Sequence, residues 1–476
     1  MLKNNIQLFN SLTEIHYIVN SVNCKAHQLN NNLLYSAKDF SRNRILTLKK
    51  MILSSISEAG GSWEDTLILN HINTSVPAYI KQLKKMKTEI FNQVLQMLNK
   101  KFYEKMSKDP DYLITLNGKF ILAVDGSDFK IPCDPHNDRY KLNNNTTYYQ
   151  MHVNFVYDVL NKIYNVVYIQ PKNSMDERIA LEHMLDQIPM PTDKYIIIGD
   201  RGYMGLNLIE TFNENNVSYL VRASKQNNST IKHLPNEPLD VETYSIVTND
   251  KNQCTRMQKI DHHWSCVPLY SDPGPQAKYA KDKSWTHKPT VCHRVPYRVV
   301  IQPTNNPNAK QKYEILITNM SATQFTATEL VLLYHLRWRI EVSFKHLKYD
   351  HGGLQFRSFN SKFNEIKIFA TAIFYNLTSI NERDLFMKNL EKEIEEYQKR
   401  KNNKHKTKPN HKIVAICFYE IYRHRFFRFK TQKEMTNFYE AWINRSECII
   451  RPGRSDKRKF KRYGHVKTLL NYAVRV

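Results

Sequence analysis

Apolar positions recur at helical spacing through the first part of the chain. Residues 1 to about 112 include the segments LTLKKMILSSI and PAYIKQLKKMKTEIFNQVLQML, in which apolar residues return every three or four positions. That spacing predicts helices, and no run in this region is typical of a strand. We therefore expect residues 1–112 to form a helical domain.

A change of period near residue 119 predicts an α/β domain with a mixed sheet. Short apolar or β-rich runs, typical of strands, occupy Lys119–Asp125, Tyr148–Val159, Ile163–Ile169, Tyr195–Asp200 and Val217–Val221. Helical spacing returns between them at Asp176–Ile188 and Leu206–Glu214. The second and third runs are separated only by a short turn at Asn161-Lys162, so we expect them to form a hairpin.

The segment from residue 223 to 325 is polar, irregular and rich in proline, with strand patterns at Tyr297–Gln302 and Tyr313–Thr318. It is too long for a loop of a compact domain, so we interpret it as an inserted, mostly β subdomain. Thr326 and Glu329 then form a capping box, which predicts the start of a long helix from Thr328 to about Tyr349. Further helices are predicted at Asn364–Leu377, Asp384–Lys399 and Lys412–Arg428, and residues 381–476 form a basic, helical C-terminal region.

The net charge of the chain indicates a negatively charged binding partner. The 476 residues carry 70 Lys and Arg against 45 Asp and Glu, a net charge of +25. Basic residues are clustered, above all after residue 450, and such a field concentrates polyanions. A general solubility charge is the alternative, but the clustering favours nucleic acid, bound with strong salt dependence.

Membrane association is not expected. The longest apolar run, Ile413–Tyr419, is far shorter than the roughly 20 residues of a membrane helix, and the first residues lack a signal-peptide core. The 7 cysteines are scattered along the chain, which argues for reduced thiols rather than disulfides. We expect a cytoplasmic protein without a membrane partner.

Two aspartates occupy positions where metal-dependent phosphoryl transfer places its ligands. Asp125 follows the apolar run FILAV and is expected where the first strand leaves the sheet, and Asp200 follows YIIIG. Pairs of Mg²⁺ ions in such sites need carboxylate oxygens. A strand exit or a helix cap is the alternative for each residue. Asp128 is a rival to Asp125, but its spacing along the strand turns it to the opposite face.

The third acid comes from the helix YHLRWRIEVSFKHLK. On a helical wheel its polar residues share one stripe, opposite a stripe of Leu, Ile and Phe. The stripe consists of Tyr334, Arg337, Glu341, Lys345 and Lys348. A solvated face with an ordinary Glu341–Lys345 pair gives the same pattern. The other interpretation is that Glu341 binds metal while the basic side chains of the stripe hold DNA phosphates.

The spacing Tyr334, Arg337, Glu341, Lys348 matches the Y-(2)-R-(3)-E-(6)-K signature of DDE transposases of the insertion-sequence-four family. VDGSDF and GDRGY resemble the two aspartate blocks of that family, and RPGR resembles its closing segment. The resemblance is ordered over about residues 40 to 455. It implies a ribonuclease H-like core, in residues 113–222 and 326–380, interrupted by the β insertion at 223–325.

The resemblance implies a role for each residue of these blocks. Asp125, Asp200 and Glu341 would form a catalytic triad that binds two Mg²⁺ ions, with Mn²⁺ as a substitute. Tyr334, Arg337 and Lys348 would contact DNA phosphates, joined by Lys345 and by Arg201 of the GDRGY block.

Members of the family cut at terminal inverted repeats through a hairpin intermediate and join the ends to target DNA, as homodimers in a synaptic complex. Residues 1–112 would bind the ends of the element. Trp264 and Trp285 of the insertion are candidates for stacking on a flipped base, although a packing role is the alternative for both.

Two rival functions share these features. One is a transposase-derived DNA-binding protein or regulator without activity, and the other is a ribonuclease H-like nuclease that never joins ends. A dinucleotide site at Gly199–Gly205 is rejected because its spacing is not G-x-G-x-x-G. The cysteines and histidines between residues 254 and 293 match no standard zinc spacing.

Overall fold

A computed structural model gives the fold of the chain. It describes residues 10–28, 33–36, 38–42, 44–57, 62–106, 113–142, 148–225, 231, 234–248, 266–268, 293–304, 312–350, 354–356, 358–397, 407–408, 411–423 and 448–449.

The described residues from 10 to 106 form helices joined by turns. The helices are α2 (Asn10–Ala26), α3 (Leu48–Ile56), α4 (Trp63–Leu69), α5 (Val76–Leu83) and α6 (Glu89–Met106). N-cap residues begin α3 and α4. The Thr47 side chain accepts a hydrogen bond from Lys50 N, and Ser62 forms a capping box with Asp65. Their apolar faces join one core with the sheet that follows.

Nine strands within the described part of the chain form one mixed sheet in the order β3-β2-β1-β4-β5-β9-β8-β6-β7. They are β1 (Phe120–Ile131), β2 (Tyr149–Asp158), β3 (Ile163–Pro171), β4 (Tyr195–Gly199), β5 (Ser218–Ala223), β6 (Leu239–Thr248), β7 (Cys266–Pro268), β8 (His293–Pro303) and β9 (Tyr313–Thr318). β1, β4 and β5 run parallel, and β2 and β3 form the predicted hairpin. The predicted mixed α/β class is confirmed, and the sheet is consistent with a ribonuclease H-like fold.

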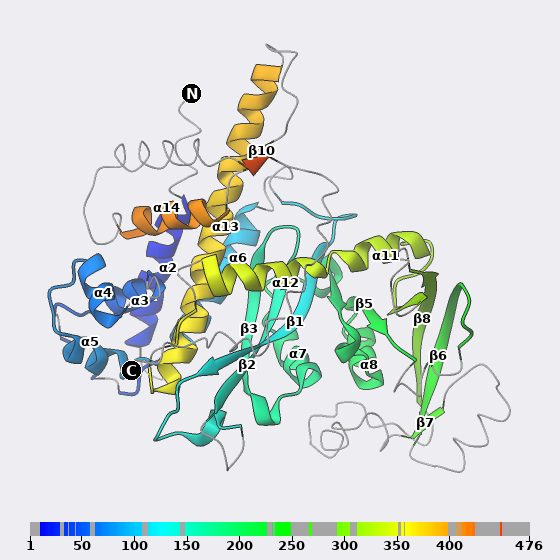
Figure 1. The fold of residues 1–476 in the computed structure, drawn as a ribbon, viewed down its shortest axis with the longest axis horizontal. Coiled ribbons are helices and arrows are strands. Elements are labelled where there is room, and N and C mark those ends of the chain that lie inside the picture. The colour runs from blue at the N-terminus through cyan, green and yellow to red at the C-terminus, as the bar shows by residue number, and fades with distance from the viewer. Residues whose placement is uncertain are drawn as a thin grey trace, which may run out of the picture.

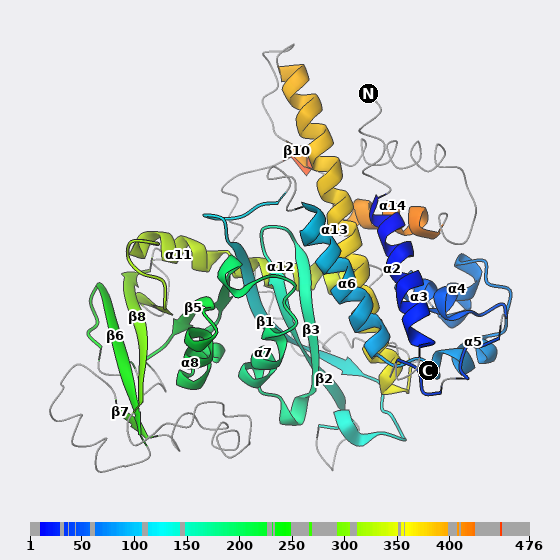
Figure 2. The same ribbon diagram turned by 180° about the vertical axis from the view of Figure 1, so that it is seen from behind.

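Helices cover both faces of the sheet (Figures 1 and 2). Ala123 of β1 packs into a core with α12 (Trp338–Lys345) and α13 (Ser361–Tyr397). Val124, the next residue, belongs to a core with α7 (Glu177–Leu185) and α8 (Leu206–Glu214). Because successive side chains of a strand point to opposite faces, β1 supplies both cores.

β1 is longer than predicted, which corrects the position of Asp125. The pattern predicted an exit from the sheet at Gly126, but β1 continues to Ile131, which pairs with Tyr149 of β2. Pairing with β4 stops earlier, at Ala123 and Ile198. Asp125 therefore lies inside a strand, just where that strand loses its parallel neighbour. The antiparallel ladder with β2 outweighs the weak strand preference of Gly126.

The helix predicted from Thr328 to Tyr349 is interrupted. The Thr326–Glu329 capping box is present and starts α11 (Ala327–His335), but α12 begins only at Trp338, and a π-helical turn follows at His346–Asp350. At the junction, the backbone N–H groups of Leu336, Arg337, Arg339 and Ile340 each bond the carbonyl three residues earlier. This tighter winding has about three residues per turn instead of about 3.6, so the junction departs from the uniform spacing that a helical wheel assumes.

The two helices predicted at Asn364–Leu377 and Asp384–Lys399 are one helix, α13, of 37 residues. Two polar residues between the predicted helices form hydrogen bonds inside the helix: Thr378 Oγ1 donates to Phe374 O, and Asn381 Nδ2 donates to Leu377 O. α13 runs between the N-terminal helices and the sheet (Figure 1). None of the helices that the structure describes combines the length and apolarity needed to cross a bilayer.

The predicted β segment from 223 to 325 contributes β6 to β9, which continue the sheet beyond β5 through antiparallel pairing of β5 with β9. Much of this segment, with Trp264 and Trp285, lies outside the described residues. At the C-terminal side, α14 is described at His411–Arg423, and β10 (Thr407–Lys408) pairs with β11 (Cys448–Ile449).

Candidate active site

Asp125 and Asp200 lie at the same edge of the sheet, because β1 and β4 are parallel neighbours. Asp200 directly follows β4, and its Oδ1 accepts a hydrogen bond of 2.7 Å from Gly202 N. Asp125 Oδ1 accepts one of 2.9 Å from Gly126 N. The helix-cap alternative is thus realised for Asp200, which caps the short turn Arg201–Tyr203. Capping leaves its other oxygen for another ligand.

The surroundings of Asp125 raise its pKa to about 7. Burial is the largest cause, Arg337 opposes it, and the negative charges of Asp200 and Glu177 raise the pKa further. The pKa of Asp200 is also raised, first by burial and in part by Glu177. The two aspartates therefore share a partly desolvated space in which burial and neighbouring acids outweigh the nearby arginines.

Glu341 reaches this space from α12 through Arg337. Arg337 Nη2 lies 2.7 Å from Glu341 Oε1, and Arg337 Nη1 lies 3.6 Å from Asp125 Oδ2. One guanidinium therefore joins the helix acid to the strand acid. Glu341 pairs with Arg337, one turn before it, while Lys345 is exposed, so the sequence alternative of a Glu341–Lys345 pair does not describe this arrangement.

The structure thus brings Asp125 and Asp200 together and links Glu341 to them, but it does not gather all three at one point. Among the described residues, no three acid, histidine or cysteine side chains converge closely enough to hold a metal ion as they stand. The donor set nevertheless fits a hard divalent cation, because carboxylate oxygens are the ligands that such ions prefer and here they line a partly buried region, where burial, with Asp200 and Glu177, raises the pKa of Asp125.

The other predicted side chains take different positions around these acids. Lys348 is half-buried, donates to Ser127 Oγ at 2.7 Å, and lies 4.5 Å from the centre of the Phe129 ring. Tyr334 is buried, with the Arg337 guanidinium 5.9 Å from its ring centre. Lys345 and Arg201 are exposed at the rim.

Sequence reasoning missed Glu177 and His152. Asp128 does face away from Asp125, as predicted, and on the α7 side His152 Nδ1 lies 2.6 Å from Asp128 Oδ1. His152 Nε2 lies 3.1 Å from Glu177 Oε1, and Lys172 Nζ lies 2.9 Å from Asp128 Oδ2. The local signal for Glu177 was an acidic pair, Asp176-Glu177, at the start of a predicted helix. Such a pair is equally typical of an ordinary helix start.

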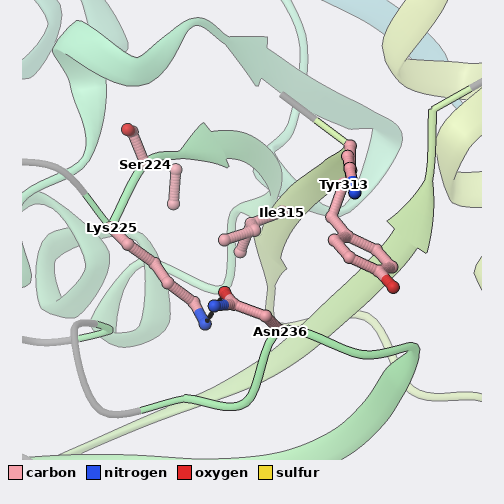
Figure 3. A pocket seen from close by; sticks show the side chains of 7 residues that line it. Ser224, Lys225, Asn236, Tyr313 and Ile315 are labelled. Carbon is pink, nitrogen blue, oxygen red and sulfur yellow. Dashed lines mark hydrogen bonds between the residues drawn. The ribbon is translucent and has the colours of Figure 1, made fainter. Parts of the chain in front are cut away.

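A separate pocket of about 580 Å³ lies where β5 ends and β9 begins (Figure 3). Its lining includes Ser224, Lys225, Asn236 and Tyr313, and none of the predicted site residues. Lys225 Nζ donates to Asn236 Oδ1 and to Pro235 O, both at 2.7 Å. These bonds hold the lysine against the chain before β6, so its ammonium group already has hydrogen-bond acceptors within the protein.

Comparison with known families identifies the domain built around these acids. The family model described as "Transposase DDE domain" matches residues 117–377, more than half of the chain. A search of curated proteins gives no match. The matched residues include every strand of the nine-stranded sheet, as well as Glu341 and its helix. The chain therefore belongs to the family of transposases with a DDE domain.

Proposed function

We propose that this protein is a transposase of the insertion-sequence-four type, which cuts its element at terminal inverted repeats and joins the freed 3′ ends to target DNA by two-metal phosphoryl transfer. Membership of the DDE transposases implies DNA as the substrate and divalent metal ions as the usual cofactor. The observation that carries the proposal is the Arg337 bridge, which joins Glu341 to Asp125 beside Asp200.

In this proposal Asp125, Asp200 and Glu341 hold two Mg²⁺ ions, which Mn²⁺ can replace. Bound there, the ions would neutralise the reacting phosphate and lower the pKa of the attacking hydroxyl. The carboxylates supply the oxygen ligands and fix their directions. Arg337 now lies between two of them, and we infer that it exchanges this pairing for a DNA phosphate when the ions bind, because its planar donors suit either partner.

The basic side chains around the acids hold the DNA. Lys348, supported by Ser127, lies beside the strand of Asp125, and Tyr334 lies under Arg337. In this proposal both side chains contact phosphates near the cleaved end, and Tyr334, which is buried in the structure without DNA, does so beside Arg337. The exposed Lys345 and Arg201 would meet more distant phosphates, since such contacts position DNA without reading its sequence.

The remaining parts of the chain take the roles predicted from sequence. Residues 1–112 bind the ends of the element, 223–325 act as a β insertion in which Trp264 and Trp285 are the candidates for base stacking, and 381–476 contact DNA and the second subunit of a dimer. Cleavage through a hairpin intermediate completes the cut-and-paste scheme. The β6–β8 and β8–β9 ladders support the β character of this segment, and these strands continue the core sheet through the β5–β9 pair.

One reaction tests the proposal against its rivals. The protein is incubated with Mg²⁺ and DNA carrying the ends of its element, and hairpins and strand-transfer products are separated on a denaturing gel. We expect both products from the wild type and neither from Glu341→Ala, which should still bind the DNA. Glu64→Gln, an exposed acid in the first turn of α4, is the control and should react normally.

Other outcomes of this assay distinguish the rival functions. Binding of the ends without cleavage by the wild type would indicate an inactive regulator, and cleavage without joining would indicate a nuclease. Full activity of Glu341→Ala would refute the assigned role of Glu341.

A further inference from the structure

Glu177 occupies a position between the two aspartates of the candidate active site. It is the first residue of α7, on the opposite side of the sheet from Glu341. Its charge nevertheless acts on both Asp125 and Asp200. A carboxylate from α7 therefore approaches the same two aspartates as Arg337 and Glu341, which come from the other face of the sheet.

Two glycines provide the space. A Cβ at Gly126, next to Asp125, would lie 2.5 Å from Glu177 Oε1, and a Cβ at Gly202 would lie 3.2 Å from Glu177 Oε2 and 3.0 Å from Asp200 Oδ1. Each carboxylate oxygen of Glu177 therefore reaches into the space left by a missing side chain. One of these spaces adjoins Asp125 and the other borders Asp200 directly.

A buried histidine, His152, contacts the carboxylate of Glu177. The side chain of His152 is 4% exposed, and its Nε2 lies 3.1 Å from Glu177 Oε1. Its Nδ1 lies 2.6 Å from Asp128 Oδ1, which in turn pairs with Lys172. A chain of close contacts between charged groups thus runs from Lys172 through Asp128 and His152 to the Glu177 carboxylate. Supporting contacts of this kind are typical behind the ligands of metal sites.

We propose that Glu177 is a fourth carboxylate of the metal site, spanning Asp125 and Asp200, with His152 as its positioning residue. This inference rests on the proposed function, since it concerns the same ions. Glu177 supplies oxygens on the α7 side of the site, whereas Glu341 supplies them from α12. The four acids then surround the ions from both faces of the sheet, which matches the six oxygen ligands that Mg²⁺ requires, with water and phosphate completing the set.

An ordinary helix start is the competing explanation, because an acid in the first turn interacts favourably with the helix dipole. Glu64 has that role in α4 and is exposed. It is therefore a matched control: replacing either residue by Gln removes an acid from a first turn, but only Glu177 adjoins the two aspartates.

The test is a titration of the full-length protein with Mn²⁺, in which free Mn²⁺ is measured by electron paramagnetic resonance in the absence of DNA. We expect Glu177→Gln to weaken Mn²⁺ binding by about 10- to 100-fold. Glu64→Gln should bind like the wild type, and Asp125→Asn and Asp200→Asn should both bind weakly. Circular dichroism and the thermal midpoint without metal establish that each variant is folded.

A second variant covers the case in which Glu177→Gln does not fold. Glu177→Asp keeps the charge but withdraws the carboxylate by one methylene, so it too should bind Mn²⁺ more weakly than the wild type. Wild-type affinity in either folded variant overturns the role of Glu177, and weak binding by Asp125→Asn in the same series leaves the proposed function intact. Wild-type affinity in Asp125→Asn and Asp200→Asn overturns the metal site itself, and the role of Glu177 with it.

Discussion

The pKa of Asp125 is raised by its surroundings, first of all by burial. Its folded pKa of about 7 lies above the ordinary value of an aspartate, so the folded state binds this proton more tightly than the unfolded state. The resulting stability is fully present below the unfolded pKa and is lost as the pH rises through about 7. Burial is the main cause of this difference, Asp200 and Glu177 add to it, and a bound cation would lower the pKa of Asp125.

We therefore predict that the metal-free protein loses about 1.4 kcal/mol of unfolding free energy through Asp125 between about pH 6 and about pH 8. Asp125→Asn should lack this part of the pH dependence, because it has no proton to release. Urea unfolding in EDTA at both pH values measures it. An identical pH dependence in the wild type and the variant would contradict the environment described for Asp125.

At the scale of elements, α13 holds the N-terminal helices against the sheet. Asn376, fully buried, accepts a hydrogen bond from Tyr164 N at 2.8 Å with its Oδ1. Its Nδ2 donates to Tyr164 O and to Asn99 Oδ1 of α6, both at 2.9 Å. One side chain thereby ties three elements together, and β3 is kept in place beneath the helix.

Asn376→Ala should lower the unfolding free energy by about 2–4 kcal/mol, because it leaves buried polar groups of Tyr164 and Asn99 without this partner. Thr378→Val is the matched control on the same helix, since its hydroxyl bonds the carbonyl of Phe374 in α13 itself. It should cost about 1 kcal/mol or less. Denaturant unfolding compares the two, and equal losses would argue against the linking role of Asn376.

At the scale of the whole molecule, the net charge of +25 dominates the encounter with DNA. Binding should weaken steeply with salt, because each phosphate neutralised contributes about 0.9 to the logarithmic slope. Removing residues 451–476 deletes nine Lys and Arg residues. We predict a shallower slope for the truncated protein, measured by fluorescence anisotropy over a range of salt concentrations. An unchanged slope would show that this segment does not touch DNA.

The sequence by itself determined the types and order of most elements, β6 and β7 excepted, because helix and strand periods, caps and turns are local. The β-rich runs of β2 and β3, the Thr326 capping box, and the spacing from Tyr334 to Lys348 could all be recognised without knowledge of the fold. Local signals also misled: a continuous helical pattern gave one helix in place of α11 and α12, and two separate patterns gave two helices in place of α13.

The tertiary structure decided which distant side chains meet. The sequence placed Asp125 and Asp200 at one edge of a sheet, but the Arg337 bridge to Glu341 depends on how α12 crosses β1. Glu177 and His152 had no signal of their own, since an acid at a helix start and a histidine in a strand are commonplace. Their significance comes from two glycines that let side chains approach from the far face of the sheet. Such proximity is a property of packing between elements, and no local pattern records it.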